Sequence, residues 1–301
     1  GREPYLVETP NYVRNYNSNN IYQAINVWAE YKKSFNDVHN LSLMAGYNQE
    51  EKTYASTSYT MTDLYDNEMP ISDLAINYKE NEEGSDIWRV QGAFFRLNYD
   101  YRSKYLLEVN GRYDGSSKYA KHDRWAFFPS ASVGWRISEE KFFKSLSKVV
   151  DNLKIRASIG ALGNQITDGN HSFMSIISGK VLTNYMMDGK IVNGLNIPTL
   201  PSMVTWEKVI TKDIGLDWSL FKNRLFGSFD FYVRDTKDMV RSVTLPAVLG
   251  TSGGKENIAD MRTVGWELEM TWKDRIQNVL GSPLDYSLTV GLSDYQAEIT
   301  K

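Results

Sequence analysis

The chain has 301 residues, a formal net charge of −3 and no cysteine. Its length suits one large domain or two ordinary ones, and its charge argues against a nucleic-acid-binding protein. Without cysteine it has no disulfide, thiolate metal site or cysteine nucleophile. No run of about 18 apolar residues is present, which excludes transmembrane helices. Transmembrane strands remain possible, because they need only one apolar face.

The first part of the chain predicts two strands and a long connection. Residues 1–20 are polar and rich in asparagine and tyrosine, which is typical of a loop. Strands are predicted at 21–33 and 39–57, where apolar residues recur at every second position. No such period is sustained over 58–86, which ends in an acidic patch, so a loop is expected there.

The central part of the chain predicts three long strands in a row. They cover residues 87–101, 105–114 and 125–138. A polar loop at 115–124 joins the second and third of these strands. The segment 139–152 then has apolar residues at helical spacing and two glutamates near its start, so it predicts one short helix with Ser138 as its N-cap.

The second of these three strands has two different faces. Tyr105, Leu107 and Val109 alternate with residues such as Glu108 and Asn110. Because successive side chains of a strand point to opposite sides, one face is apolar and aromatic and the other is mostly polar. A soluble sheet shows this pattern with its polar face in water, and a membrane barrel shows it with its polar face toward the lumen.

The last part of the chain predicts five more strands. They are expected at 153–163, 206–220, 225–240, 262–273 and 284–299. Loops of about 40 and about 20 residues are expected at 164–205 and 242–261, and a short connection at 274–283.

Two regularities favour a membrane barrel over a soluble sheet. The predicted strands are about 11–18 residues long, whereas strands of globular sheets usually have about 5–6 residues and bilayer-spanning strands need about 10. Short and long connections also alternate, which places all short turns at one end of the sheet and all long loops at the other. Outer-membrane barrels have short periplasmic turns and long extracellular loops, and soluble sandwiches have no reason to sort their loops in this way.

A stripe of charged and amide side chains is predicted on the polar face and would face the lumen of a barrel. These residues could bind a polar solute or contact a plug, or they could only solvate the lumen and pair across strands. The candidate lumen-facing residues are Arg96, Asp100, Glu108, Asn110, Arg112, Asp114, Arg136 and Arg156.

Other candidate sites have simpler explanations. His39, His122 and His171 lie far apart in the sequence and do not predict a metal site. Asp213 with Asp217, or Glu267 with Glu269, could form a glycosidase pair, but carboxylates on a lumen face explain them. Tryptophans near strand ends could stack on sugars, or those that face outward could form an aromatic girdle at the membrane interface. These are Trp125, Trp135, Trp206, Trp218, Trp266 and Trp272. No catalytic, cofactor-binding or metal motif is apparent, so an enzyme is not expected.

Three motifs carry a resemblance to a known family. They are RYDGSS at 112–117, RWAFFPSASVGWRISEE at 124–140 and GWELE at 265–269. With the segments around them they resemble the β-barrel of the SusC/RagA-like family of TonB-linked outer-membrane transporters. The resemblance covers about half of the chain, in the family's order.

The resemblance implies an all-β fold, an antiparallel meander of about ten long strands that forms part of a transmembrane barrel of about 22 strands, with one short periplasmic helix. Residues 1–301 would then be a partial barrel domain, with the plug domain, the TonB box and the remaining strands absent. Such a chain would belong to the outer membrane of a Gram-negative bacterium, as a fragment of a transporter for active uptake of glycan or peptide oligomers.

The resemblance also implies partners. They would be a SusD-like surface lipoprotein, the TonB-ExbB-ExbD complex acting through the plug region, outer-membrane lipid, and an oligosaccharide or peptide substrate. No cofactor and no nucleic acid are expected. The alternative is a soluble or surface β-rich protein that binds carbohydrate through exposed tyrosines and tryptophans.

Overall fold

The fold of the chain is known from a computed structural model. The structure describes residues 12–65, 71–165, 169–171, 173–174, 181–195, 202–246, 248, 253–279 and 281–301. The chain divides into two compact units, Gly1–Ile25 with Gln49–Arg89 and Asn26–Asn48 with Val90–Lys301. Across the described ranges, no helix has the length and apolar character needed to cross a membrane.

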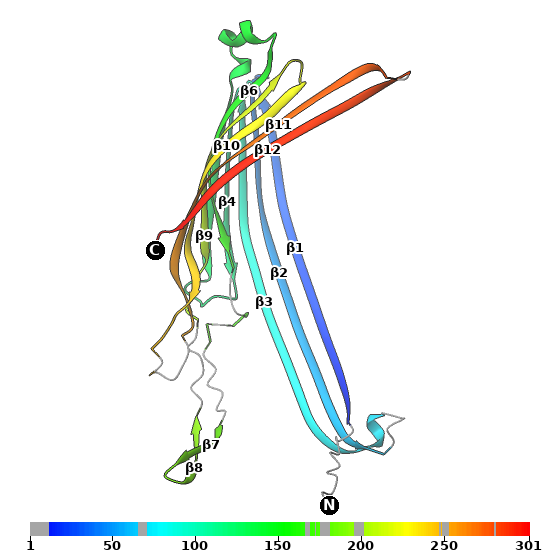
Figure 1. The fold of residues 1–301 in the computed structure, drawn as a ribbon, viewed down its shortest axis with the longest axis vertical. Helices are drawn as coiled ribbons and strands as arrows, with labels where there is room; N and C mark the ends of the chain where they lie inside the picture. The colour runs from blue at the N-terminus through cyan, green and yellow to red at the C-terminus, as the bar shows by residue number, and fades with distance from the viewer. Residues whose placement is uncertain are drawn as a thin grey trace, which may run out of the picture. The chain divides into compact units, whose positions relative to one another are not determined.

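Ten strands form one sheet in the order β1-β2-β3-β4-β5-β6-β9-β10-β11-β12, in which each strand lies beside the next one along the chain (Figure 1). Within the described ranges, the departure from this order is a separate hairpin of β7 and β8, which lies between β6 and β9 in the sequence. The strands are β1 (Tyr12–Phe35), β2 (His39–Leu64), β3 (Ala75–Tyr101), β4 (Tyr105–Ser116), β5 (Trp125–Arg136), β6 (Val150–Asn164), β7 (Val181–Met187), β8 (Lys190–Leu195), β9 (Glu207–Leu220), β10 (Leu225–Ser242), β11 (Lys255–Val279) and β12 (Ser282–Ile299). The predicted antiparallel meander of ten long strands is confirmed.

The first unit contains the first parts of β1 and β3 and the last part of β2. The loop predicted at 58–86 is wrong, because most of this segment continues β2 and β3 around the short 3-10 helix η1 (Ser72–Leu74). Polar contacts between strands support this extension. Arg14 donates a 3.1 Å hydrogen bond to Ser58 and pairs with Glu82. Residues 58–86 show no apolar alternation, so no local pattern predicts these parts of β2 and β3.

The start of β1 also differs from the prediction. Residues 12–20, expected as part of a loop, belong to β1, whereas residues 1–11 lie outside the described ranges. In this part of β1 polar residues and tyrosines follow one another without an apolar stripe, so the pattern resembles a loop.

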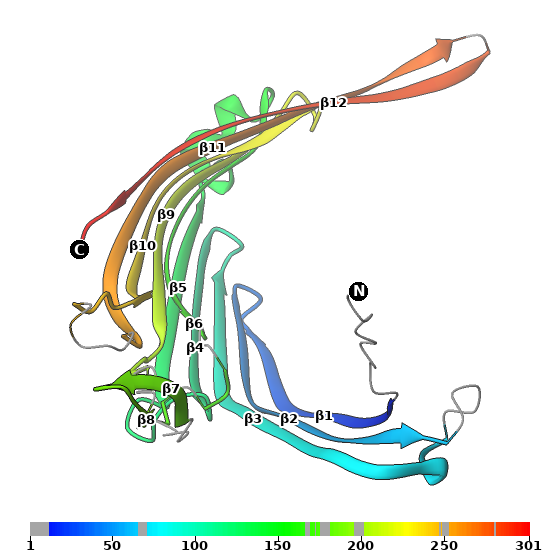
Figure 2. The same ribbon diagram turned by 60° about the horizontal axis from the view of Figure 1, so that its bottom comes forward.

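The second unit contains the antiparallel pairs from β3 to β12, and Figure 2 shows β9, β10 and β11 side by side within it. In this register, apolar residues on neighbouring strands are paired directly with one another across seven strands. One such row runs Tyr105, Trp135, Ile155, Leu216, Phe229, Leu268 and Leu292. Directly paired residues project from the same side of a sheet, so this row marks one continuous apolar face.

The apolar face is exposed. Val133 in β5 is 53% exposed and Ile214 in β9 is 61% exposed, although both lie within strands of the sheet and not in turns. The neighbouring Phe231 is 44% exposed. Soluble monomers rarely expose a contiguous apolar patch of this kind, so this face requires an apolar environment or a partner surface.

The connections alternate in length as predicted. The links after β1, β3, β9 and β11 are tight turns, and several use left-handed backbone conformations, as at Asn36, Arg102 and Lys222. The links after β2, β4, β6 and β10 are longer. Since consecutive strands are neighbours in the sheet, the tight turns lie at one end and the links after β2, β4, β6 and β10 at the other. The link after β5, residues 137–149, is the exception: it is long but lies at the end with the tight turns.

The short helix predicted at 139–152 forms in a smaller and tighter version. The link from β5 to β6 contains two 3-10 helices, η2 (Ile137–Glu139) and η3 (Lys141–Leu146), and β6 begins at Val150. Ser138 does not cap a helix, because its hydroxyl bonds to Asn152 instead. No side chain caps η2 or η3, which fits helices that end after one or two turns.

Two predicted loops contain strands. The hairpin of β7 and β8 lies within the segment expected as a loop at 164–205. β11 begins at Lys255 and continues to Val279, so it takes up parts of the connections expected at 242–261 and 274–283. Both ends of β11 are rich in polar residues, which hides a strand from a pattern based on apolar alternation.

Candidate functional site

The eight candidate residues all lie on the polar face of the sheet. Arg96 of β3 pairs with Asn110 of β4. Asp100 lies four residues after Arg96 on β3 and therefore on the same side of the sheet. In β5 and β6, Arg136 pairs with Lys154, which is two residues from Arg156. The other three, Glu108, Arg112 and Asp114, alternate with Asn110 along β4.

Most of these side chains bond to one another. Arg96 Nε donates to Asn110 Oδ1 at 2.8 Å, and Asn110 Nδ2 donates to Glu108 Oε1 at 2.7 Å. Arg112 makes two hydrogen bonds to Asp114, at 2.8 and 3.1 Å. This network satisfies the polar groups and keeps both signs of charge on the surface, and it leaves donors and acceptors accessible to water or a polar solute.

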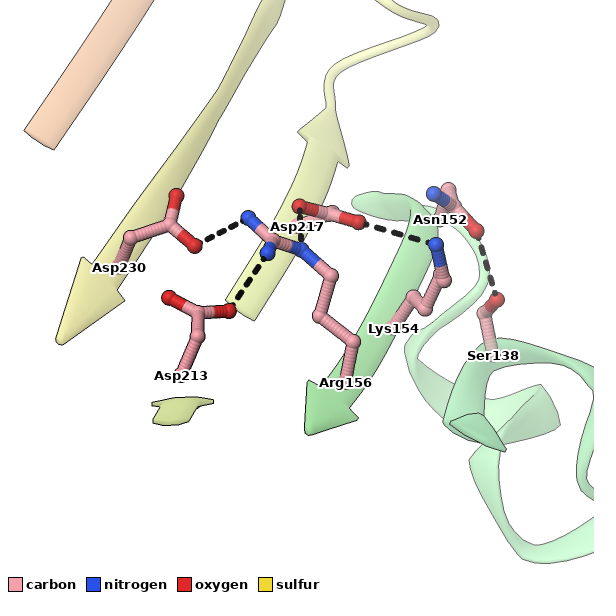
Figure 3. Close-up of polar contacts among 7 residues, drawn as sticks. All are labelled: Ser138, Asn152, Lys154, Arg156, Asp213, Asp217 and Asp230. Atoms are coloured by element: carbon pink, nitrogen blue, oxygen red, sulfur yellow. Dashed lines mark hydrogen bonds and ion pairs between the residues drawn. The ribbon is translucent and has the colours of Figure 1, made fainter. Parts of the chain in front are cut away.

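The densest group on this face is the Arg156 cluster, which consists of Arg156, Asp213, Asp217 and Asp230 (Figure 3). Arg156 of β6 contacts Asp213 and Asp217 of β9 at 3.0 and 3.1 Å, and it also pairs with Asp230 of β10. Lys154 lies 3.3 Å from the second oxygen of Asp217. The guanidinium uses its several N–H groups to hold three carboxylates that would otherwise repel one another.

Gly215 makes room for the Arg156 cluster. Gly215 lies on β9 and is paired directly with Arg156 of β6 on one side and with Asp230 of β10 on the other. A Cβ at Gly215 would collide with the guanidinium carbon of Arg156. Arg156 can therefore lie flat across β9 and reach β10 only because position 215 has no side chain.

The Arg156 cluster gives the predicted carboxylate pair a structural role. Asp213 and Asp217 were the candidates for a glycosidase pair, and both are engaged by Arg156. The sequence analysis did not select Asp230 as a site residue. The alternation of β10 places Asp230 on the face opposite Phe229 and Phe231, and this pattern could have marked it as a polar-face residue. Only the pairing of β9 with β10 shows that Asp230 lies next to Arg156.

A cleft of about 660 Å³ opens within the second unit beside this network. Its polar lining includes Lys32, Asn98, Asp100, Glu108 and Arg156. Three of the eight candidates therefore border the cleft, and no tryptophan is among the residues that line it. These charged and amide groups lie beside apolar side chains such as Leu41 and Leu106, so the lining suits a solute that has both polar and apolar parts.

At the long-loop end, a hydrophobic cluster joins the polar face to the loops. This Trp206 cluster consists of Tyr119, Phe128, Val204 and Trp206. Trp206 packs against the rings of Tyr119 and Phe128 at centroid distances of 5.2 and 5.3 Å, and its indole N–H donates to the Arg124 carbonyl. Trp206 is thus part of a loop anchor and not of an outward girdle.

A buried carboxylate stabilises the backbone beside the Trp206 cluster. Glu207 accepts hydrogen bonds from the backbone N–H of Val240 at 2.6 Å and from the Asn164 side chain at 3.2 Å. Burial, together with the charge of Glu207, raises the pKa of the Tyr119 phenol above its usual value. No sequence pattern predicts the Trp206 cluster, because its members come from a strand and two loops that are far apart in the chain.

Other tryptophans lie on the apolar face. Trp135 stacks on Tyr105 at 6.5 Å near the short-turn end, and Trp125 stacks on Tyr113 at 5.0 Å near the long-loop end. His39 bonds to the Tyr99 hydroxyl at 2.7 Å. Among the described residues, no group of three or more histidine, aspartate or glutamate side chains is placed to hold a metal ion.

Comparison with known proteins gives consistent matches. The sequence model of the family "TonB dependent receptor-like, beta-barrel" matches residues 2–300. TonB-dependent receptor P39 of Formosa agariphila is 32% identical over 246 residues, which are 81% of this chain and 23% of that protein. TonB-dependent receptor SusC of Bacteroides thetaiotaomicron is 30% identical over 200 residues, 65% of this chain and 20% of SusC.

A solved structure supports the fold. The RagAB peptide transporter aligns with a TM-score of 0.79 over 99% of this chain and 32% of that chain, at 23% sequence identity. The chain therefore spans about a third of the length of that solved chain and less than a quarter of the length of the curated relatives. The family's sequence model matches nearly every residue, and the antiparallel sheet with its two different faces is the fold expected of that family. The chain belongs to the TonB-dependent receptor-like β-barrel family.

Proposed function

We propose that this chain forms part of the wall and the external loops of an outer-membrane transporter that takes up nutrients with energy from the TonB system. The observation that carries the proposal is the exposed apolar face, on which Val133 and Ile214 remain more than half accessible within their strands. Lipid would cover this face, and the charged face behind it would border water. The proposed role includes no bond chemistry.

The spacing of aromatic residues on the apolar face supports a bilayer environment. Tyr105 and Tyr113 lie at opposite ends of β4, each stacked on a tryptophan of β5. Eight residues of strand separate them by about 26 Å, comparable to the apolar band of about 25 Å in transmembrane barrels. The short turns would then face the periplasm and the long loops the outside.

The eight polar-face candidates would line the lumen. Because the chain contains no cysteine, single cysteines can test this assignment without background. Asn110→Cys should react with a water-soluble maleimide in intact outer membranes, and the adjacent Val109→Cys should not react until detergent removes the lipid. Equal labelling of both variants before detergent is added would contradict the assignment.

The substrate would be an oligomer of sugars or amino acids. The name of the RagAB peptide transporter supports the peptide class, and the glycan class follows from the resemblance to the SusC/RagA-like family. We further propose a SusD-like lipoprotein at the outer surface and the TonB-ExbB-ExbD complex at the inner end. Uptake of labelled oligosaccharides and oligopeptides, compared between wild-type and deletion strains, would identify the class. Uptake should stop when a protonophore collapses the proton gradient.

Cell fractionation tests the proposal against the alternative of a soluble carbohydrate-binding protein. The protein produced from its native gene should sediment with outer membranes. It should also migrate differently in gels before and after heating, as folded barrels do. Recovery in the soluble fraction without detergent would overturn the proposal and favour the alternative. The exposed apolar face is the observation that argues against a soluble protein.

A further inference from the structure

The link between β5 and β6, residues 137–149, exposes apolar side chains where a periplasmic turn is expected. Phe142 is 68% exposed, Leu146 53% and Val149 46%, whereas the adjacent Phe143 is buried. Phe143 thus holds the link in place, and the other three apolar groups face away from the protein. Such exposure has a cost in water, and it needs a separate explanation from the membrane-spanning face.

The central part of this segment, from Lys141 to Lys148, is basic. Lys141, Lys144 and Lys148 are all exposed, and no acidic residue lies between the first and the last of them. Three cations therefore alternate with the exposed Phe142 and Leu146. Lysines mixed with large apolar residues are typical of segments that lie in a membrane interface, where the apolar groups enter the lipid and the ammonium groups reach its phosphates.

Contacts fix this link at the rim of the apolar face. Glu140, at its start, accepts hydrogen bonds from Tyr105 at 2.8 Å and Trp135 at 3.3 Å, both of which belong to the apolar face. At its end, the Val149 carbonyl accepts a 2.8 Å hydrogen bond from the backbone N–H of Phe221 in the next turn. The exposed residues are thus presented next to the aromatic rim by a bonded framework.

Neighbouring turns continue the basic rim. Arg102 lies over the ring of Tyr101 at 5.3 Å, and Lys33 lies over the ring of Phe35 at 4.8 Å. Both rings are on the apolar face, and both turns are at the same end of the sheet as the β5–β6 link. A cation held over an interfacial aromatic ring is placed at the depth of lipid headgroups.

We propose that the short-turn end of this chain is a binding surface for anionic phospholipid, with the β5–β6 link as its centre. The lysines and Arg102 bind headgroup phosphates of the inner leaflet, and Phe142, Leu146 and Val149 enter the interface. The proposal rests on the transmembrane role proposed above. Charge complementarity favours lipid over an apolar protein surface, because three lysines are interspersed with the exposed apolar groups, inside the two exposed carboxylates Glu139 and Asp151.

Native mass spectrometry of the detergent-solubilised protein, produced from its native gene, tests this surface. The protein is mixed with equal amounts of phosphatidylglycerol and phosphatidylcholine that carry the same acyl chains. The wild type should retain phosphatidylglycerol preferentially. Each basic residue near an anionic surface contributes about 1 kcal/mol, so Lys144→Gln with Lys148→Gln should reduce that preference by about tenfold or more. Gel migration before and after heating, measured on each variant, checks that the barrel is folded.

A matched control removes two exposed lysines on the long-loop side, Lys121→Gln with Lys190→Gln, and should keep the preference. Equal retention of both lipids by a heat-modifiable wild type would overturn the lipid surface and leave the transporter proposal standing. An equal loss in the control variant would also overturn it. If the wild type shows no heat-modifiable migration, the transmembrane role fails and the lipid surface fails with it.

Discussion

At the residue scale, the arginines of the polar face differ in how many acceptors they hold. Arg156 is the clearest case, since one guanidinium neutralises carboxylates from two neighbouring strands and its side chain is only 30% exposed. Arg96 on the same face makes one hydrogen bond, to the neutral Asn110. The two arginines look alike in the sequence but have unequal structural roles.

Replacing Arg156 should destabilise the sheet more than replacing Arg96. Arg156→Met leaves Asp213, Asp217 and Asp230 facing one another without a counter-charge. Its expected cost is about 1–3 kcal/mol, less than for a fully buried ion pair because water partly screens the site. Arg96→Met should cost less than about 1 kcal/mol. Urea unfolding in detergent micelles measures both, and equal losses would show that the cluster has no special role.

Glu140 should make stability depend on pH. Hydrogen bonds from Tyr105 and Trp135, with Lys104 nearby, lower the pKa of this carboxyl below its usual 4.5. A lowered pKa in the folded state means that the contribution is fully present above pH 4.5 and is lost as the pH falls through the folded-state value. Glu140→Gln should therefore lose less thermal stability than the wild type between pH 7 and pH 3.5. An identical pH dependence would contradict this role.

At the element scale, the strands agree with the sequence where apolar alternation is present, and they depart from it where polar contacts replace it. β4 was predicted at 105–114 and is found at Tyr105–Ser116, because its apolar residues alternate over its whole length. The outer part of β3 was expected as a loop, because it is held by polar contacts with residues more than 20 positions away, such as Glu82 with Ser58. Long-range contacts of this kind leave no local period.

The candidate site could be predicted only in part for the same reason. The alternation of β4 was enough to place Glu108, Asn110 and Arg112 on one face. The partners of Arg156 depend on the register between β6, β9 and β10, which a single sequence does not determine. The spacing of apolar residues after Glu140 predicted a helix, but it could not show that the helices would be 3-10 and end by Leu146.

The Trp206 cluster should control the order of the long loops. Trp206→Ala removes a nearly fully buried ring and its hydrogen bond to Arg124, with an expected local cost of about 3 kcal/mol or more. The loop at 117–124 should then be cleaved after Lys121 by a lysine-specific protease at least tenfold faster. Trp125→Ala, which removes an exposed ring from the apolar face, is the matched control and should leave the cleavage rate unchanged. Similar rates in the two variants would rule out loop anchoring by this cluster.

At the scale of the whole molecule, the two faces of the sheet require different surroundings. Rows of apolar side chains alternate with rows that contain Arg156, Asp230 and Glu267, and this order holds across strands that are distant in the sequence. β1 has 24 residues, which corresponds to about 80 Å of strand. A membrane span takes about 10 residues, so more than half of β1 would lie outside the apolar layer.

Two adjacent substitutions distinguish a lipid-facing sheet from a water-facing one. Val133→Arg places a cation on the apolar face, between its middle and the rim at Trp135, and should cost about 1–3 kcal/mol if lipid covers that face. Ser132→Arg places the same side chain on the polar face and should cost much less. Unfolding in lipid bilayers measures the difference. Because Val133 is 53% exposed, a water-facing sheet would tolerate both changes, and that result would exclude the membrane assignment.

The strict alternation of the two faces also limits how this protein can evolve. Deleting one residue inside β9 would exchange the surroundings of every side chain between the deletion and the next turn, so lipid would meet the aspartates and water the isoleucines. A deletion in a long link changes only the length of that link. Across natural variants, the strands should therefore change by substitution and the long links by insertion and deletion, so that new recognition loops can arise while the wall stays the same.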